Sequence, residues 1–282
     1  MMRVLTIARL TVLEASRRKL LLALALLTLV VIVLTSWGFS RLPTMNGVTP
    51  AEVRVAASQL TILVAFMFSG VLALGSTLVA APSIASDIES GIALAILPRP
   101  IRRSEVLIGK WLGLAVLIAL YAVLSGVLEM VGIWWATTYL PPNPAAAIVF
   151  VAAEGIVLMT LALLLSTRLA PMTGGVIALV LFFVGWIGGI ALAIGQTFEN
   201  NTIINIGVGS RLLIPTDGLW HGAIFYLEPS DFLAAARAAG RVRAGNPFFA
   251  DSSLPLPYLL WIVGWILIVA LLANWSFARR DL

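Results

Sequence analysis

The stretch LLLALALLTLVVIVLTSWGF, residues Leu20–Phe39, decides the class of fold. It contains no charged residue, and a helix of roughly 20 apolar residues is long enough to cross the hydrocarbon core of a bilayer. Five further stretches of this kind follow along the chain, at about residues 58–81, 106–139, 145–166, 174–194 and 257–277. None shows the alternating pattern of a strand. The sequence therefore predicts an all-α membrane protein with six transmembrane helices in one domain, residues 1–282.

The composition supports this class of protein and excludes several others. Hydrophobic residues make up 61% of the chain and charged residues 11%, whereas soluble domains carry about 25% charged residues. In so apolar a chain, a net charge of +5 indicates topology signals and contacts with anionic lipid rather than nucleic-acid binding. There is no cysteine and a single histidine, His221. We therefore expect no disulfide, no thiol nucleophile, no catalytic residue and no metal site.

The distribution of Lys and Arg predicts the orientation in the membrane. If the N-terminus is cytoplasmic, the cytoplasmic segments hold twelve of these residues and the short external loops hold two. The remaining four lie in the long segment 196–256, and long loops count for little in this rule. We therefore predict a multi-pass protein of the inner (plasma) membrane with both termini in the cytoplasm.

The N-terminal segment, residues 1–19, has an imperfect amphipathic pattern. Val4, Ala8, Val12 and Ala15 fall on one side of a helical wheel, but other apolar residues fall elsewhere. One interpretation is an elbow helix that lies on the inner leaflet. The alternative is an N-terminal extension of the first transmembrane helix.

The segment between the fifth and sixth apolar stretches, residues 196–256, is predicted to be external and helical. It contains an apolar portion that ends near Leu227 and an Ala-rich portion that begins at Ser230. We expect two short helices here, the first dipping into the outer leaflet. The alternative is a loosely packed cap.

A polar island, SIASDIESGIALAILPRPIRRSEVLIGK, separates the second and third apolar stretches at Ser83–Lys110. Four isoleucines recur every fourth residue, which places them on one helix face: Ile84, Ile88, Ile92 and Ile96. Pro98 then ends the pattern. The sequence predicts a short amphipathic helix, residues 83–97, along the cytoplasmic membrane surface. An ordinary solvated loop helix anchored by lipid is the alternative.

Within this island, the order of residue types resembles a known family. An acidic residue is followed by a glycine, a Leu-rich turn, a proline, a basic pair and a Gly-Lys that opens the next span. This pattern resembles the permease subunits of ABC-2 type transporters, with Glu89 nearest to the family's acidic position. The resemblance extends over nearly the whole chain, and IPTDGLW at Ile214–Trp220 is similar to a motif that recurs in the external segment. The most similar branch is the one named for multi-copper enzyme maturation.

The resemblance implies that the helix at 83–97 is a coupling helix, which sits in a groove of a separate ABC ATPase subunit. The residues at that interface would be Ser86, Asp87, Glu89, Ser90, Gly91, Arg99, Arg102 and Arg103. The external motif residues would be Pro215, Asp217 and Trp220. A second permease copy or a homologue would complete the membrane core. Membrane lipid and an external or periplasmic protein are further expected partners.

The energy source is expected in the partner chain. The sequence contains no G-x-x-x-x-G-K-[ST] phosphate loop, and LIGKW at Leu107–Trp111 lacks both the first glycine and the hydroxyl residue. We therefore expect no cofactor on this chain and no enzymatic activity of its own. ATP and Mg would be used by the ATPase subunit.

Two glutamates, Glu129 and Glu154, lie inside predicted transmembrane helices. Ionisable groups at membrane depth usually face the bundle interior or a wet cavity. Counted from a tight turn at residues 139–145, both lie about 14 Å deep, so they are expected at one level. They would then form a carboxyl pair that shares a proton along the transport pathway. The alternative is two separate structural residues, each protonated, capped or hydrated.

These patterns predict a permease that couples ATP hydrolysis to export or to mechanical transmission across the membrane. A non-transporting anchor that acts on an external partner is the alternative. An intramembrane enzyme is disfavoured, because the predicted transmembrane helices contain no His cluster and no Lys or Asp deep inside them. A copper channel is disfavoured by the absence of cysteine. The cargo is not specified by the sequence.

Overall fold

The computed structural model describes residues 2–17, 19–44, 47, 49–89, 102–229, 233, 246, 248–250 and 252–280. Within these ranges the chain is helical and contains no strand. A short 3₁₀ turn, Leu42–Thr44, follows the second helix. The α-helices are α1 (Met2–Ser16), α2 (Lys19–Arg41), α3 (Pro50–Ala80), α4 (Pro82–Glu89), α6 (Arg103–Thr137), α7 (Pro144–Ser166), α8 (Pro171–Thr197), α9 (Asn201–Leu213), α10 (Thr216–Leu227) and α12 (Leu256–Ala278).

Six of these helices are long and apolar enough to cross a membrane: α2, α3, α6, α7, α8 and α12. The predicted all-α fold with six transmembrane helices is therefore confirmed. Helix α3, with 31 residues, starts eight residues before the apolar range read from the sequence, whereas α6, with 35 residues, nearly coincides with its range. The early start of α3 is explained by its cap. The Thr49 hydroxyl accepts the Glu52 N–H at 3.3 Å, and the Glu52 carboxylate accepts the Thr49 N–H at 2.8 Å.

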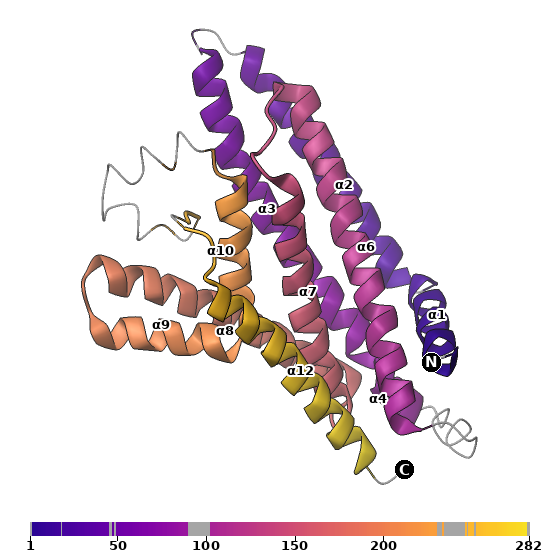
Figure 1. Cartoon of the computed structure of the whole chain (residues 1–282). Coiled ribbons are helices and arrows are strands. Elements are labelled where there is room, and N and C mark those ends of the chain that lie inside the picture. The colour runs from indigo at the N-terminus through magenta and orange to yellow at the C-terminus, as the bar shows by residue number, and fades with distance from the viewer. Residues whose placement is uncertain are drawn as a thin grey trace.

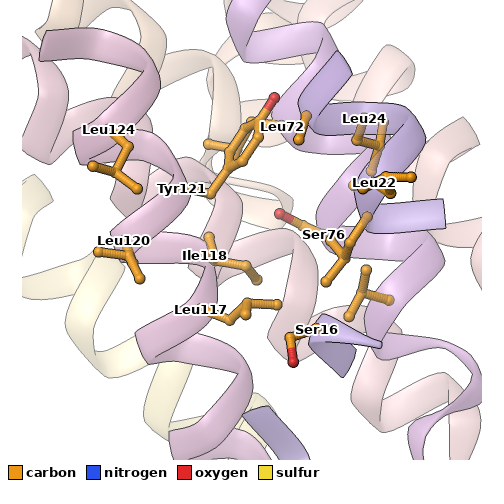
Figure 2. A pocket seen from close by; sticks show the side chains of 14 residues that line it. Ser16, Leu22, Leu24, Leu72, Ser76, Leu117, Ile118, Leu120, Tyr121 and Leu124 are labelled. Atoms are coloured by element: carbon orange, nitrogen blue, oxygen red, sulfur yellow. The ribbon is translucent and has the colours of Figure 1, made fainter. Parts of the chain in front are cut away.

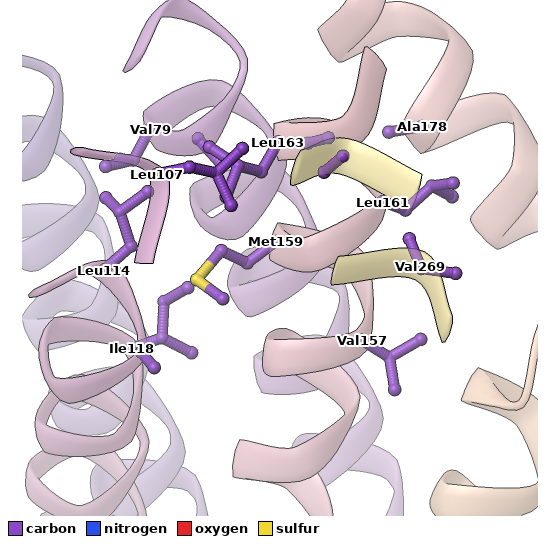
Figure 3. Close-up of a cluster of buried hydrophobic side chains, with 14 of the residues drawn as sticks. Val79, Leu107, Leu114, Ile118, Val157, Met159, Leu161, Leu163, Ala178 and Val269 are labelled. Carbon is purple, nitrogen blue, oxygen red and sulfur yellow. The ribbon is translucent and has the colours of Figure 1, made fainter. Parts of the chain in front are cut away.

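The centre of the bundle is α7, which packs against α3, α6, α8, α10 and α12. Figure 3 shows Met159 and Leu163 of α7 meeting Leu114 and Ile118 of α6 in the main cluster of buried apolar side chains. In contrast, α2 and α12 lie at the edges of the bundle and leave most of their apolar side chains exposed (Figure 1). Such surfaces are expected where helices face hydrocarbon rather than water.

The segment after α8 turns back into the bundle instead of staying outside it. In Figure 1, α9 returns along α8, and α10 then runs beside α7. The turn between α9 and α10 reaches the middle of α8, because a Cβ on Gly185 would lie only 2.9 Å from the Thr216 hydroxyl. The first helix expected in the segment 196–256 corresponds to α10, which packs against the bundle, and the position of the segment relative to the membrane stays a prediction. The second helix expected there, from Ser230 on, lies outside the described residues.

Candidate functional site

The short helix α4 follows α3 after a single residue, Ala81, and packs against α7 and α8. Ile84 is buried and Ile88 packs against the main apolar cluster, so the isoleucine face points inward as its spacing indicates. Glu89 is exposed. The other isoleucines of the pattern, Ile92 and Ile96, lie outside the described residues.

A buried lysine holds α4 to α6. The Lys110 ammonium group donates to the carboxylate of Asp87 and to the backbone carbonyl of Ser83, both in the α4 segment. The Lys110 side chain is 8% exposed and the Asp87 side chain 20%. Breaking such a pair strands a charge away from water, which is costly. The lysine of the LIGKW stretch therefore connects α6 to α4.

Two glycines of α6 let α1 lie directly on it. A Cβ on Gly109 would lie 2.7 Å from the Ile7 side chain, and one on Gly113 would lie 2.5 Å from the Ala8 carbonyl oxygen. Neither position can hold a larger residue without moving α1. The helix α1 ends at Ser16 and packs chiefly against α6, so the start of the chain is fixed to the same segment as α4. Its placement on the inner leaflet stays a prediction.

Arginines bind the C-terminal end of α12 in the same region. The Arg103 guanidinium donates to the backbone carbonyls of Phe277, Ala278 and Arg280, at 3.3, 3.1 and 2.7 Å. Arg168 donates to the Ser276 hydroxyl at 3.0 Å and to the Ser276 carbonyl at 3.2 Å. The last carbonyls of a helix have no partner within the helix and favour a positive charge nearby. The end of α12 is thereby fixed to the start of α6.

The residues predicted to contact an ATPase fall into three groups. Asp87 and Arg103 are committed within the chain, to Lys110 and to the end of α12. Glu89 and Arg102 are exposed on either side of the segment 90–101, and Ser86 is partly buried. Three of the predicted residues lie outside the described residues: Ser90, Gly91 and Arg99. Of the described residues in the prediction, Glu89 and Arg102 are the exposed charged side chains that another chain could contact.

The two buried glutamates bond to different helices. Glu129 is 3% exposed, and its carboxylate accepts the Thr35 hydroxyl of α2 at 3.2 Å. Glu154 is 2% exposed, and its carboxylate accepts the Ser69 hydroxyl of α3 at 2.8 Å. Among the described residues, no hydrogen bond joins the two carboxyl groups.

The register of α6 against α7 explains why the two glutamates are apart. A Cβ on Gly126 would lie 2.6 Å from Ile148, and one on Gly155 would lie 2.8 Å from Ile118. Glu129 therefore lies level with the first turn of α7. Glu154 lies about nine residues further along α7, or about 14 Å deeper. The structure does not bring these carboxyl groups to one level, and their role in a transport pathway stays a prediction.

The expected tight turn at residues 139–145 caused this error. Residues 139–143 between α6 and α7 are not helical, and the Asn143 N–H donates to the Tyr226 carbonyl of α10 at 3.2 Å. The Tyr139 hydroxyl donates to the Leu227 carbonyl at 3.2 Å. Burial, with the charge of Glu228, raises the pKa of Tyr139 to about 12, so this hydroxyl stays protonated at neutral pH. The connection runs along the bundle rather than straight across it, so α7 does not begin level with the end of α6.

The comparison with known proteins agrees with this arrangement. The family model described as ABC-2 family transporter protein matches residues 5–282. The chain belongs to the ABC-2 transporter family. No curated protein matches it. The family match covers most of α1, the six apolar helices and the α9–α10 segment. This ABC-2 protein is therefore a multi-pass membrane protein.

A buried charge cluster lies where α9 turns into α10 of the ABC-2 protein. Asp217 is 3% exposed, and its Oδ2 lies 2.5 Å from Nε of Arg211. His221 Nδ1 lies 2.9 Å from the Asp217 carbonyl oxygen and 3.1 Å from the Arg211 guanidinium. The carboxylate occupies space left by Gly189, where a Cβ would lie 1.9 Å from Asp217 Oδ1. The Asp of the IPTDGLW motif is therefore part of an internal ion pair.

Three aromatic residues of α12 complete this turn. The side chains of Tyr258, Trp261 and Trp265 donate to the last three carbonyls of α9, at 3.1, 3.1 and 2.8 Å. These carbonyls belong to Arg211, Leu212 and Leu213. Inside a bilayer no water can replace such partners. Because residues three and four apart share a helix face, the aromatic spacing in α12 was the available sequence signal, and it was missed.

The other two motif residues are structural. Pro215 precedes the first turn of α10. Trp220 is 2% exposed, and its ring lies 5.5 Å from that of Phe66 in α3. The motif thus places α10 against α3, α7 and α8.

Proposed function

We propose that this ABC-2 protein is the permease subunit of an ABC transporter, and that it couples ATP hydrolysis on a separate ATPase chain to export across the membrane. The observation that carries the proposal is the bond from Lys110 to Asp87 and Ser83. It joins a short helix at one end of the bundle to the start of the longest helix in the described part of the chain. A force on α4 is then transmitted to α6 rather than lost in a loop.

The neighbouring contacts spread that motion through the bundle. Because α1 packs directly on Gly109 and Gly113, it would move with α6. The end of α12 would move with α6 as well, because Arg103 is bonded to its carbonyls. The other end of α12 donates to the carbonyls of the α9–α10 turn. A displacement of α4 would therefore reach both the centre of the bundle and its far side. This connection also supports the second candidate function, mechanical transmission to an external or periplasmic partner.

The partner surface in this proposal is the exposed end of α4 together with the start of α6. Glu89 and Arg102 are exposed there, and the ATPase chain would bind ATP and Mg. This end would face the cytoplasm of the inner membrane, as would both termini. The permease would work as a pair of copies or of homologues.

In this proposal the second copy packs on an apolar stripe of α8. Val176, Val180, Phe183 and Ile187 are all about half exposed, although α8 is packed against α7 and α9 on its other sides. Residues at this spacing form one helix face. Such a face would pack against another permease chain or against lipid.

The test is the effect of Glu89→Ala and Arg102→Glu on ATPase binding. We expect both variants to insert normally but to bind the ATPase chain about tenfold more weakly, since losing an interface charge contact costs about 1.4 kcal/mol. The measurement is ATP hydrolysis in reconstituted vesicles as the purified ATPase subunit is titrated. Glu199→Ala, at the connection between α8 and α9, is the matched control. Full stimulation of hydrolysis by both variants, with an unchanged midpoint, would refute the coupling role of α4.

A further inference from the structure

A large apolar cavity opens between α2, α3 and α6, in the half of the bundle nearer to α4. Its volume is about 320 Å³, roughly twice that of an engineered apolar cavity that binds benzene. It is lined by Leu21 and Leu24 of α2, by Leu72 and Val79 of α3, and by Ile118 of α6. Figure 2 shows these helices around the open space.

The lining is almost entirely hydrocarbon. The polar groups at the wall are the hydroxyls of Ser16, Ser76 and Tyr121. The Tyr121 hydroxyl is hydrogen-bonded to that of Thr28, a contact that joins α6 to α2 one turn beyond Leu24. This contact closes the inner end of the cavity. A polar or charged ligand would find too few partners here, so the occupant must be apolar along most of its length.

The mouth of the cavity faces the apolar outer surface of the bundle. Leu22, Leu120 and Leu124 line the cavity, yet their side chains are 65%, 54% and 55% exposed. They are exposed on α2 and α6 at positions that hydrocarbon would surround in a bilayer. The medium continuous with the cavity is therefore lipid, and an acyl chain can enter sideways without crossing a polar barrier.

The other end of the opening is basic. Ser16 lines the cavity at the end of α1, and it is followed in the sequence by Arg17, Arg18 and Lys19. Arg17 and Lys19 are exposed. Clusters of this kind attract the phosphate of anionic lipids. From Leu72 to Val79 the lining of the cavity runs about 10 Å along α3, so a chain can fill it while its headgroup stays at the basic joint.

We propose that this cavity is a binding site for one anionic glycerophospholipid, whose acyl chain fills the space between α2, α3 and α6 and whose phosphate lies at the α1–α2 joint. The bound chain acts as a wedge between α2 and the α3–α6 pair. The site is separate from the ATPase-contact surface at Glu89, so its test does not depend on the proposed coupling.

The experiment uses the full-length protein in vesicles that contain phosphatidylglycerol with a photoreactive diazirine in the middle of one acyl chain. After irradiation and proteolysis, we expect label concentrated on residues 21–25 and 117–124. Gly75→Leu should fill the cavity, because Gly75 lines it and a Cβ on Gly75 would lie 3.2 Å from Leu24 Cδ1 on the facing helix. It should reduce this label to the level found on exposed α12. Gly38→Leu, on α2 with nothing within 4 Å, should leave it unchanged.

A second arm tests the headgroup. The same photoreactive chain on phosphatidylcholine should label the cavity less, and Arg17→Glu with Lys19→Glu should lower phosphatidylglycerol labelling about fivefold for each charge removed. The mapping in the wild-type protein needs no variant to fold. Label spread evenly over α2 and α12, or equal labelling by both lipids, would overturn the proposal.

Discussion

Replacing Gly189 with alanine should destabilise the protein, although alanine is the better helix former. The new methyl group would lie 1.9 Å from Asp217 Oδ1 and 2.1 Å from its carboxyl carbon. The carboxylate must then leave its present position, which is 2.5 Å from Arg211 Nε. Because disrupting a buried ion pair by loss of one partner costs about 3–5 kcal/mol, we expect a loss of about 3 kcal/mol in the free energy of unfolding.

The measurement is unfolding of the purified protein in mixed detergent micelles, followed by circular dichroism. Gly264→Ala on α12 is the matched control, because nothing lies within 4 Å of a Cβ at that position. There the change should be neutral or stabilising by up to about 1 kcal/mol, since alanine is favoured over glycine in helices. Equal shifts at the two positions would mean that the α9–α10 turn is not seated on Gly189.

Replacing Lys110 with methionine should have the second large effect. The variant keeps the length of the side chain but leaves Asp87 without its cation and removes the side-chain donor to the Ser83 carbonyl. Since the Asp87 side chain is 20% exposed, water offsets part of the cost, and we expect about 2–3 kcal/mol of destabilisation. Stimulation of the ATPase should fall as well, because α4 is no longer held to α6.

A double-mutant cycle with Asp87→Asn isolates this pair. The two changes together should cost less than the sum of the single changes by about 1 kcal/mol or more. Arg54→Met, which removes an exposed basic residue of α3, is the control and should change stability by less than about 0.5 kcal/mol. Strict additivity of Lys110→Met and Asp87→Asn would show that the tie between α4 and α6 carries no energy.

The six apolar helices were predictable because a bilayer imposes length and composition on each one separately. The inward face of α4 was predictable for a similar reason, since the spacing of Ile84 and Ile88 is a local property. These features require no knowledge of which helix packs against which.

The contacts that define the site were not predictable, because they join residues far apart in the sequence. Nothing near Lys110 indicates that its partner is Asp87, and the aromatic spacing in α12 marks a shared helix face but does not identify α9 as its partner. A second signal was available besides the aromatic spacing in α12. Gly185, Gly188 and Gly189 share a face of α8, and small residues at such spacing mark close helix packing. They indicated that another segment, here the α9–α10 turn, lies against the middle of α8.

The prediction that Glu129 and Glu154 pair was wrong about their depth because it depended on one assumption about a loop. Their depths were counted from a turn at residues 139–145 that was taken to be tight. The non-helical connection instead runs along the bundle beside α10, so the start of α7 lies level with a point about seven residues before the end of α6. Loop length in residues gave no measure of the axial distance that the loop covers.

The most direct test of the coupling role is photo-crosslinking in living cells from a photoreactive residue placed at position 89. Glu89 is exposed at the end of α4. A second variant carries the same photoreactive group at Asn143, which precedes the first residue of α7. We predict that position 89 yields an adduct with a protein that contains the G-x-x-x-x-G-K-[ST] phosphate loop of an ATPase, and that position 143 does not. Such an adduct from position 143, or from neither position, would contradict the proposal that α4 couples this permease to an ATPase.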